Sequence, residues 1–114
     1  ESIKESYIYT NNNMRLTPEQ VTIIKKAGAE TFGDTARIWL FGSRVDDHKR
    51  GGDIDLLIET EETDVMRIVK TELAVMVNLQ MQLGEQKIDV LVDYPSRKVS
   101  PPIVEVAKQT GILL

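Results

Sequence analysis

The sequence predicts an α/β (α+β) domain, with a small mixed β-sheet of three or more strands and helices packed on it. Apolar strand-like runs alternate with helical segments, in the order helix–strand–turn–strand–helix–strand–helix. The 114 residues suit one domain, and 41% hydrophobic with 28% charged residues is typical of a folded globular chain. The sequence has no internal repeats.

Composition restricts the chemistry that the chain can perform. It has no cysteine, which excludes disulfides, thiolate zinc sites and cysteine nucleophiles, and its one histidine, His48, is expected to be a solvated loop residue. The 14 basic and 18 acidic side chains leave a net charge of −4, which argues against non-specific nucleic-acid binding. No apolar run approaches the roughly 18–20 residues that span a bilayer. We therefore expect a cytoplasmic protein whose chemistry rests on carboxylates, hydroxyls, backbone amides and a few cations.

Two segments are distinguished by their sequence pattern. Residues 1–13 have no helical periodicity and end in three asparagines, so we interpret them as an N-terminal extension, either disordered or left over from cloning. A short edge strand is the alternative, because Tyr7 and Tyr9 are two residues apart. Residues 14–114 are expected to form the folded domain.

The first helix is predicted from Thr17 to Gly33. Thr17 is a suitable N-cap, Pro18 fits the first helical position, and Gln20 completes a capping box. The apolar positions of this helix are Val21, Ile24, Ala27 and Gly28. Strands are expected over residues 36–41, 53–59 and 87–93, and a last helix from Ser100-Pro101 to Gly111.

A long helix is predicted between the second and third strands. Thr63 or Asp64 caps its start, and it ends at Gly84. We expect one apolar stripe to face the sheet, formed by Val65, Val69, Leu73, Met76, Leu79 and Leu83. Val75, Val77 and Met81 fall outside this stripe. They indicate either cover by another helix of the domain or an interface.

Three aspartates interrupt apolar strands. Asp53 and Asp55 are two residues apart in one strand and so project from the same face, and Asp89 lies inside another strand. Neighbouring carboxylates repel each other, and a bound hard cation such as Mg²⁺ or Mn²⁺ would compensate. The alternative is that these residues lie on a solvated sheet face.

A second candidate feature follows the first strand directly. Gly42-Ser43 ends that strand, where free backbone N–H groups and a hydroxyl can cradle a phosphate. Arg44, Lys49 and Arg50 cluster in the following loop of an otherwise acidic chain. A simple tight turn is the alternative for this segment.

Taken together, these motifs resemble the DNA polymerase β-like nucleotidyltransferase superfamily. The layout is Leu40-Phe41-Gly42-Ser43, nine residues, then Asp53-Ile-Asp55, then an isolated strand aspartate at Asp89. The stretch Trp39–Glu59 resembles the minimal bacterial members called MNT proteins, and the resemblance covers nearly all of residues 14–114.

The resemblance implies a role for each motif. Asp53 and Asp55 would hold two Mg²⁺ ions, with Mn²⁺ as an alternative, and Asp89 would complete the metal site that activates the attacking hydroxyl. Gly42 and Ser43 would grip the β,γ-phosphates of a nucleoside triphosphate, with secondary phosphate contacts from Arg44, Lys49 and Arg50. Two departures bear on nucleotide affinity: Arg44 is followed by Val45-Asp46-Asp47 rather than a second arginine, and Gly52 stands where serine is common.

The expected reaction moves a nucleoside monophosphate, AMP from ATP, onto a hydroxyl. By resemblance the partner is a small helical HEPN-type protein, a tyrosine of which would be modified in an antitoxin role, and a homodimer is a further expectation. The alternatives are a non-catalytic partner-binding antitoxin and a nucleotidyltransferase that modifies small molecules such as antibiotics.

Overall fold

The computed structural model describes residues 16–42, 54–84, 86–97 and 101–114. The three helices of these ranges are α2 (Pro18–Phe32), α3 (Val65–Leu83) and α4 (Pro102–Thr110). The strands are β1 (Arg37–Phe41), β2 (Ile54–Glu59), β3 (Ile88–Asp93) and β4 (Ile112–Leu113). The expectations for residues 1–13 lie outside the described part of the chain.

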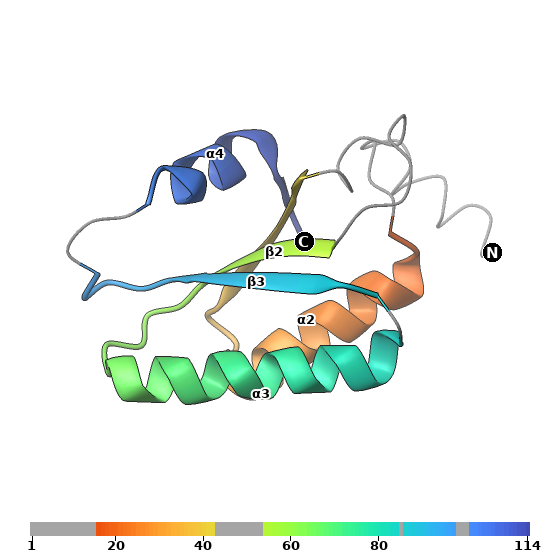
Figure 1. The fold of residues 1–114 in the computed structure, drawn as a ribbon, viewed down its shortest axis with the longest axis horizontal. Coiled ribbons are helices and arrows are strands. Elements are labelled where there is room, and N and C mark those ends of the chain that lie inside the picture. Colours follow the sequence, from red (N-terminus) through yellow and green to blue (C-terminus); the bar gives the residue numbers. More distant parts are fainter. Residues whose placement is uncertain (1–15, 43–53, 85, 98–100) are drawn as a thin grey trace.

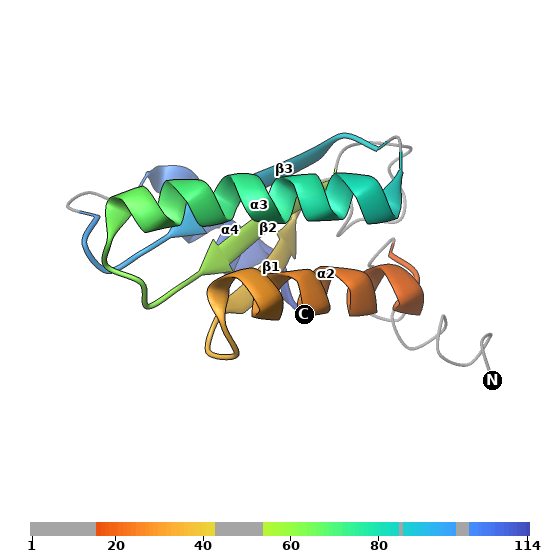
Figure 2. The same ribbon diagram turned by 90° about the horizontal axis from the view of Figure 1, so that it is seen from below.

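The four strands form one mixed sheet in the order β3-β2-β1-β4. β1 runs antiparallel to both β2 and β4, whereas β2 and β3 are parallel. Because parallel neighbours need a crossover connection, α3 links β2 to β3. Figure 1 shows α4 on one face of the sheet and α2 and α3 on the other, and Figure 2 shows α2 and α3 lying side by side. The predicted α+β fold class is confirmed.

Helix α2 forms as its sequence predicts. The Thr17 hydroxyl accepts a hydrogen bond from the Gln20 backbone N–H at 3.1 Å, and the Gln20 side chain accepts one from the Thr17 N–H at 2.9 Å. Two orphan donors of the first turn are thereby satisfied. The helix ends at Gly33, which has φ +94°. Val21, Ile24, Ala27 and Gly28 are buried, as the sequence predicts.

The core is divided between the two faces of the sheet. Alternate β2 residues such as Leu56 and Ile58 face α2 and α3 and belong to the larger cluster. Leu57 points to the other face, where it packs with Val104 and Ala107 of α4. β2 is therefore an interior strand that is buried on both sides in its middle.

The buried face of α3 differs from the predicted one. Val65, Val69 and Leu73 are exposed, whereas Ile68 and Val75, which the predicted stripe did not include, are buried. Leu79 is buried, and Met76 and Leu83 pack against the core, as expected. At 100° per residue the buried face is turned by about 60° from the predicted stripe. The error arises because this helix is apolar over much more than one face, so the pattern does not define which side meets the sheet.

The ends of the elements refine several other predictions. Asp64 is the N-cap of α3, with its carboxylate accepting from the Met66 and Arg67 N–H groups. Helix α4 begins at Pro102 with Pro101 as N-cap and no side-chain cap bond. β4 is not predicted by the sequence, because two residues carry no periodicity. None of the helices within the described ranges is long and apolar enough to cross a membrane.

Candidate active site

Two of the three predicted aspartates lie side by side. In the parallel β2–β3 pair, Asp55 is the direct partner of Asp89. Neighbouring strands are about 4.8 Å apart, so in-register residues project from the same face as close neighbours. That face is the one covered by α4, because Leu57, two residues after Asp55, packs against α4. Asp55 is half-buried and Asp89 is exposed.

Gly42 brings the backbone directly against this acid pair. It follows β1, whose last residue Phe41 is the antiparallel partner of Asp55. Gly42 has φ +76°, a conformation that side-chain-bearing residues rarely adopt. A Cβ at this position would overlap Asp55 Oδ2 and would lie 3.1 Å from Asp55 Cγ. The dihedral angle therefore favours glycine, and any Cβ at this position would have to displace the Asp55 carboxylate.

The structure thus brings together three of the predicted site residues: Gly42, Asp55 and Asp89. The others, Ser43, Arg44, Lys49, Arg50 and Asp53, lie outside the described residues, as does His48. Asp53 directly precedes Ile54, the first residue of β2. The roles of all these residues in catalysis, nucleotide binding and metal binding stay predictions.

The acid pair is chemically suited to a hard cation. Carboxylate oxygens are the preferred ligands of Mg²⁺, which takes one or two of them from the protein and completes its shell with water and phosphate. Asp55 and Asp89 supply two such groups from adjacent rigid strands. Within the described ranges no group of three or more His, Cys, Asp or Glu side chains is placed to hold a metal ion. The described part of the site is therefore a two-carboxylate set.

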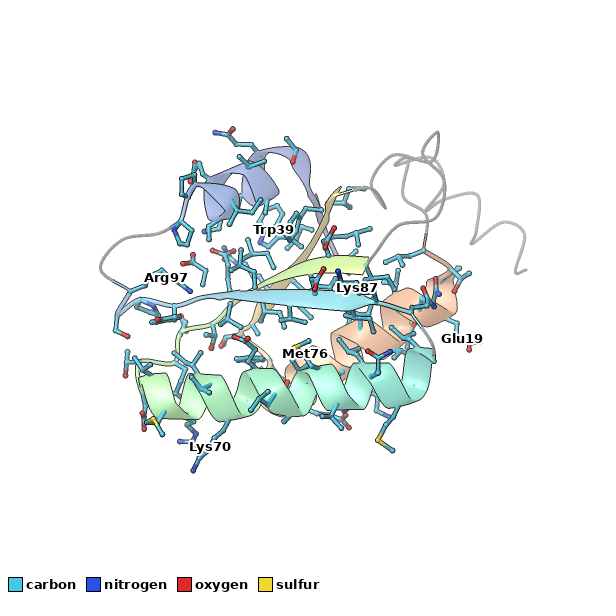
Figure 3. All side chains as sticks on the ribbon, viewed as in Figure 1. Glu19, Trp39, Lys70, Met76, Lys87 and Arg97 are labelled. Carbon is cyan, nitrogen blue, oxygen red and sulfur yellow. The ribbon has the colours of Figure 1, made fainter. Side chains whose placement is uncertain are left out.

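Sequence reasoning missed one cation at this end of the sheet. Lys87 immediately precedes β3, and its carbonyl accepts a hydrogen bond from the Ile54 N–H at 2.9 Å. By the two-residue period of a strand, Lys87 lies on the same face as Asp89. Figure 3 shows Lys87 where β2 and β3 begin. The alternation in Lys87-Ile88-Asp89 was the signal that could have found it.

A second acid pair lies four residues further along the same two strands. Glu59 and Asp93 are also direct partners. Here Lys108 of α4 binds both, at 2.7 Å to Glu59 Oε2 and 3.2 Å to Asp93 Oδ2, and Trp39 Nε1 donates to Glu59 Oε1 at 2.9 Å. These contacts attach α4 to the far end of the sheet from Asp55 and Asp89.

The electrostatics of this second pair follow from those contacts. Burial raises the pKa of Glu59, but the hydrogen bonds from Lys108 and Trp39 outweigh it and hold that pKa below its ordinary value. The hydrogen bond to Glu59 raises the pKa of Lys108. The same sheet face therefore carries one acid pair that the protein neutralises with Lys108, at the end opposite the candidate site.

The mixed sheet, the neighbouring carboxylates at the strand starts and the glycine turn are consistent with the polymerase β-like nucleotidyltransferase class that the sequence motifs resemble. A sequence model of the family described as "Nucleotidyltransferase domain" matches residues 21–114, so the chain belongs to this family. The match includes all four strands and both described aspartates. The class of reaction of this domain is nucleotidyl transfer. No curated protein sequence matches the chain significantly.

Proposed function

We propose that the protein transfers AMP from ATP to a hydroxyl group on a partner protein, in a reaction that depends on Mg²⁺. The single observation that carries this proposal is the in-register placement of Asp55 and Asp89 beside the Gly42 turn. An acceptor oxygen would form a bond to the α-phosphorus while the bond to the β-phosphate oxygen breaks and pyrophosphate leaves. The hydroxyl proton would pass to solvent.

Each element of the site has a part in this proposal. Asp53, Asp55 and Asp89 would hold two divalent cations, which when bound would stabilise both the attacking and the leaving oxygens. Mn²⁺ has the same ligand preference and would substitute for Mg²⁺. Gly42 and Ser43 would bind the β,γ-phosphates, with Arg44, Lys49 and Arg50 as further phosphate contacts. Fixed donors on rigid strands support such charge stabilisation because they need no reorganisation during the reaction.

The nature of the acceptor is proposed from the family resemblance. The motifs around Gly42, Asp55 and Asp89 resemble those of the minimal members of the superfamily, which are paired with small helical proteins. We therefore propose as the acceptor a HEPN-type helical protein with a modified tyrosine, which would make the chain the antitoxin of a cytoplasmic toxin–antitoxin pair.

The reaction class is tested with two labelled forms of ATP. The chain and the proteins that co-purify with it are incubated with Mg²⁺ and ATP labelled at either the α- or the γ-phosphate. Protein-bound label from the α-position alone is expected, because nucleotidyl transfer retains the α-phosphate and releases the γ-phosphate. Label from the γ-position would indicate phosphoryl transfer and would contradict the proposal.

Substitutions connect this reaction to the described site. Asp55→Asn and Asp89→Asn should each lower labelling at least about 100-fold, as loss of a charge-stabilising group typically does. Asp34→Asn is the matched control, because Asp34 is an exposed acid in the turn before β1. The candidate site lies at the opposite end of β1, next to Gly42. Equal labelling by Asp55→Asn and wild-type protein would exclude this carboxylate from the reaction. A protein that neutralises its partner without any labelling would be the non-catalytic module instead.

A further inference from the structure

Lys87 lies on the sheet face that carries both carboxylates of the candidate site. Its side chain is exposed, whereas that of the next residue, Ile88, is buried in the larger core cluster on the side of α2 and α3. Successive strand residues point to opposite faces, so Lys87 and Asp89 both project from the α4 side of the sheet. At the rise of an extended chain their Cα atoms are about 6.5 Å apart. The four-carbon stem of a lysine is long enough to bring its ammonium group to the edge of the acid pair.

The backbone of Lys87 is held from two directions. Its carbonyl accepts a hydrogen bond from the N–H of Ile54, the first residue of β2, at 2.9 Å. From the other side, Gln80 of α3 donates through Nε2 to the carbonyls of Gly84 and Gln86, at 2.7 Å each. These bonds fix the point at which the chain enters β3. The lysine side chain therefore starts from a defined position beside Asp55 and Asp89.

The second acid pair shows a different arrangement of carboxylates and lysine. Lys108 comes from α4, which covers that end of the sheet, and ion pairs of 2.7 Å and 3.2 Å hold it on Glu59 and Asp93. Lys87 comes from the strand segment itself, so it approaches the first pair from the side. A cation at the side of a carboxylate pair can attract an anion that binds there together with a metal ion.

We propose that Lys87 binds a phosphate oxygen of the nucleotide that enters this site, an inference that rests on the nucleotidyl-transfer function proposed above. The lysine ammonium is a compact charge with three donors and is a common ligand of phosphate. The same charge opposes the binding of a metal ion on its own, because like charges repel each other at this distance even in water. Lys87 therefore strengthens the binding of the nucleotide and weakens that of the free metal ion.

Two separate titrations of Lys87→Met test this pair of opposite effects. Mn²⁺ binding without nucleotide is measured by electron paramagnetic resonance of the free ion at low added salt. Lys87→Met should bind Mn²⁺ about fivefold more tightly, because the repulsion of a doubly charged ion is removed. ATP binding is measured by equilibrium dialysis in saturating Mn²⁺, where a difference in metal affinity no longer enters. Here the variant should bind at least about fivefold more weakly, because a charge-assisted hydrogen bond is lost.

Two control variants separate the charge of Lys87 from its other properties. Lys70→Met removes the same charge from α3, where Lys70 is exposed and points away from the sheet (Figure 3), and should leave both affinities unchanged. Lys87→Arg keeps the charge and should change both affinities less than Lys87→Met does. In about 1 M salt both differences between Lys87→Met and wild type should shrink, because the Debye length of about 3 Å is then shorter than the separation of the charges.

The possible outcomes distinguish this inference from the proposed function. If wild-type protein binds both probes and Lys87→Met binds ATP equally well, the inference is overturned and the proposed function stands. If Lys87→Met loses affinity for both Mn²⁺ and ATP, Lys87 supports the structure of the site rather than binding phosphate, and the inference is again overturned. Wild-type protein that binds neither Mn²⁺ nor ATP would refute the proposed function, and the inference with it.

Discussion

Gly42→Ala tests whether the close approach of the turn to Asp55 organises the candidate site. Two costs follow from the structure. At φ +76° an alanine is strained by about 1–2 kcal/mol, which for a domain of this size lowers the melting temperature by roughly 5–10 °C. The new Cβ would also overlap Asp55 Oδ2, so the carboxylate must move by about 1 Å to restore ordinary contact. The backbone strain lowers the stability of the whole domain, whereas the displacement of the carboxylate changes the geometry of the acid pair.

The assay for this variant needs neither acceptor nor nucleotide. Mn²⁺ binding is measured by electron paramagnetic resonance of the free ion, alongside thermal unfolding. Displacing a ligand or its support typically costs 10- to 100-fold in metal affinity, and we expect a loss of about that size for Gly42→Ala. Addition of ATP should not restore the lost affinity, because the displaced group belongs to the protein.

A second glycine supplies the matched control. Gly33 has φ +94°, but a Cβ there would meet nothing within 4 Å. Gly33→Ala should therefore lose comparable stability and keep wild-type Mn²⁺ affinity. If Gly42→Ala also kept wild-type affinity, its contact with Asp55 would have no part in positioning the carboxylate. If both variants lost affinity equally, the loss would reflect general destabilisation, and the reasoning would fail.

Two further predictions concern stability. Lys108→Met should cost about 1 kcal/mol near pH 7, because Glu59 and Asp93 would then face each other without their shared cation. The pKa of Glu59 is lower in the folded protein than in the unfolded chain, so its contribution to stability is present above the unfolded pKa and is lost as pH falls through the folded pKa. Urea unfolding should therefore show the stabilities of the two proteins converging in acid. An equal gap at pH 3 and pH 7 would contradict this. Asp64→Ala should cost about 1 kcal/mol by removing the α3 cap, whereas Thr63→Ala should be nearly neutral; equal losses in thermal unfolding would reject Asp64 as the cap.

The sheet was more predictable from the sequence than the long helix. In a strand every second side chain shares a face, so the pattern around Asp55 and Asp89 left only their relative register open. The parallel β2–β3 pairing supplies that register. In α3 the apolar residues cover more than one face, and positions such as Val75 and Leu73 look alike in sequence although one is buried and the other exposed. Only the packing of α3 against the sheet distinguishes these two positions, and the sequence pattern of the helix does not reveal which side packs there.

The two acid pairs on one sheet face show why the sequence could locate the candidate site but could not predict which other elements contact its carboxylates. Identical strand positions bring Asp55 beside Asp89 and Glu59 beside Asp93, so backbone geometry alone produces both pairs. What makes them different is the next layer: Lys108 of α4 binds the second pair, whereas the Gly42 turn meets the first. Lys108 binds both carboxylates of the second pair, so the loss of this lysine is measured as a loss of stability. The first pair offers two in-register carboxylates of the kind that a hard cation prefers, so Mn²⁺ affinity is the measurement that tests it.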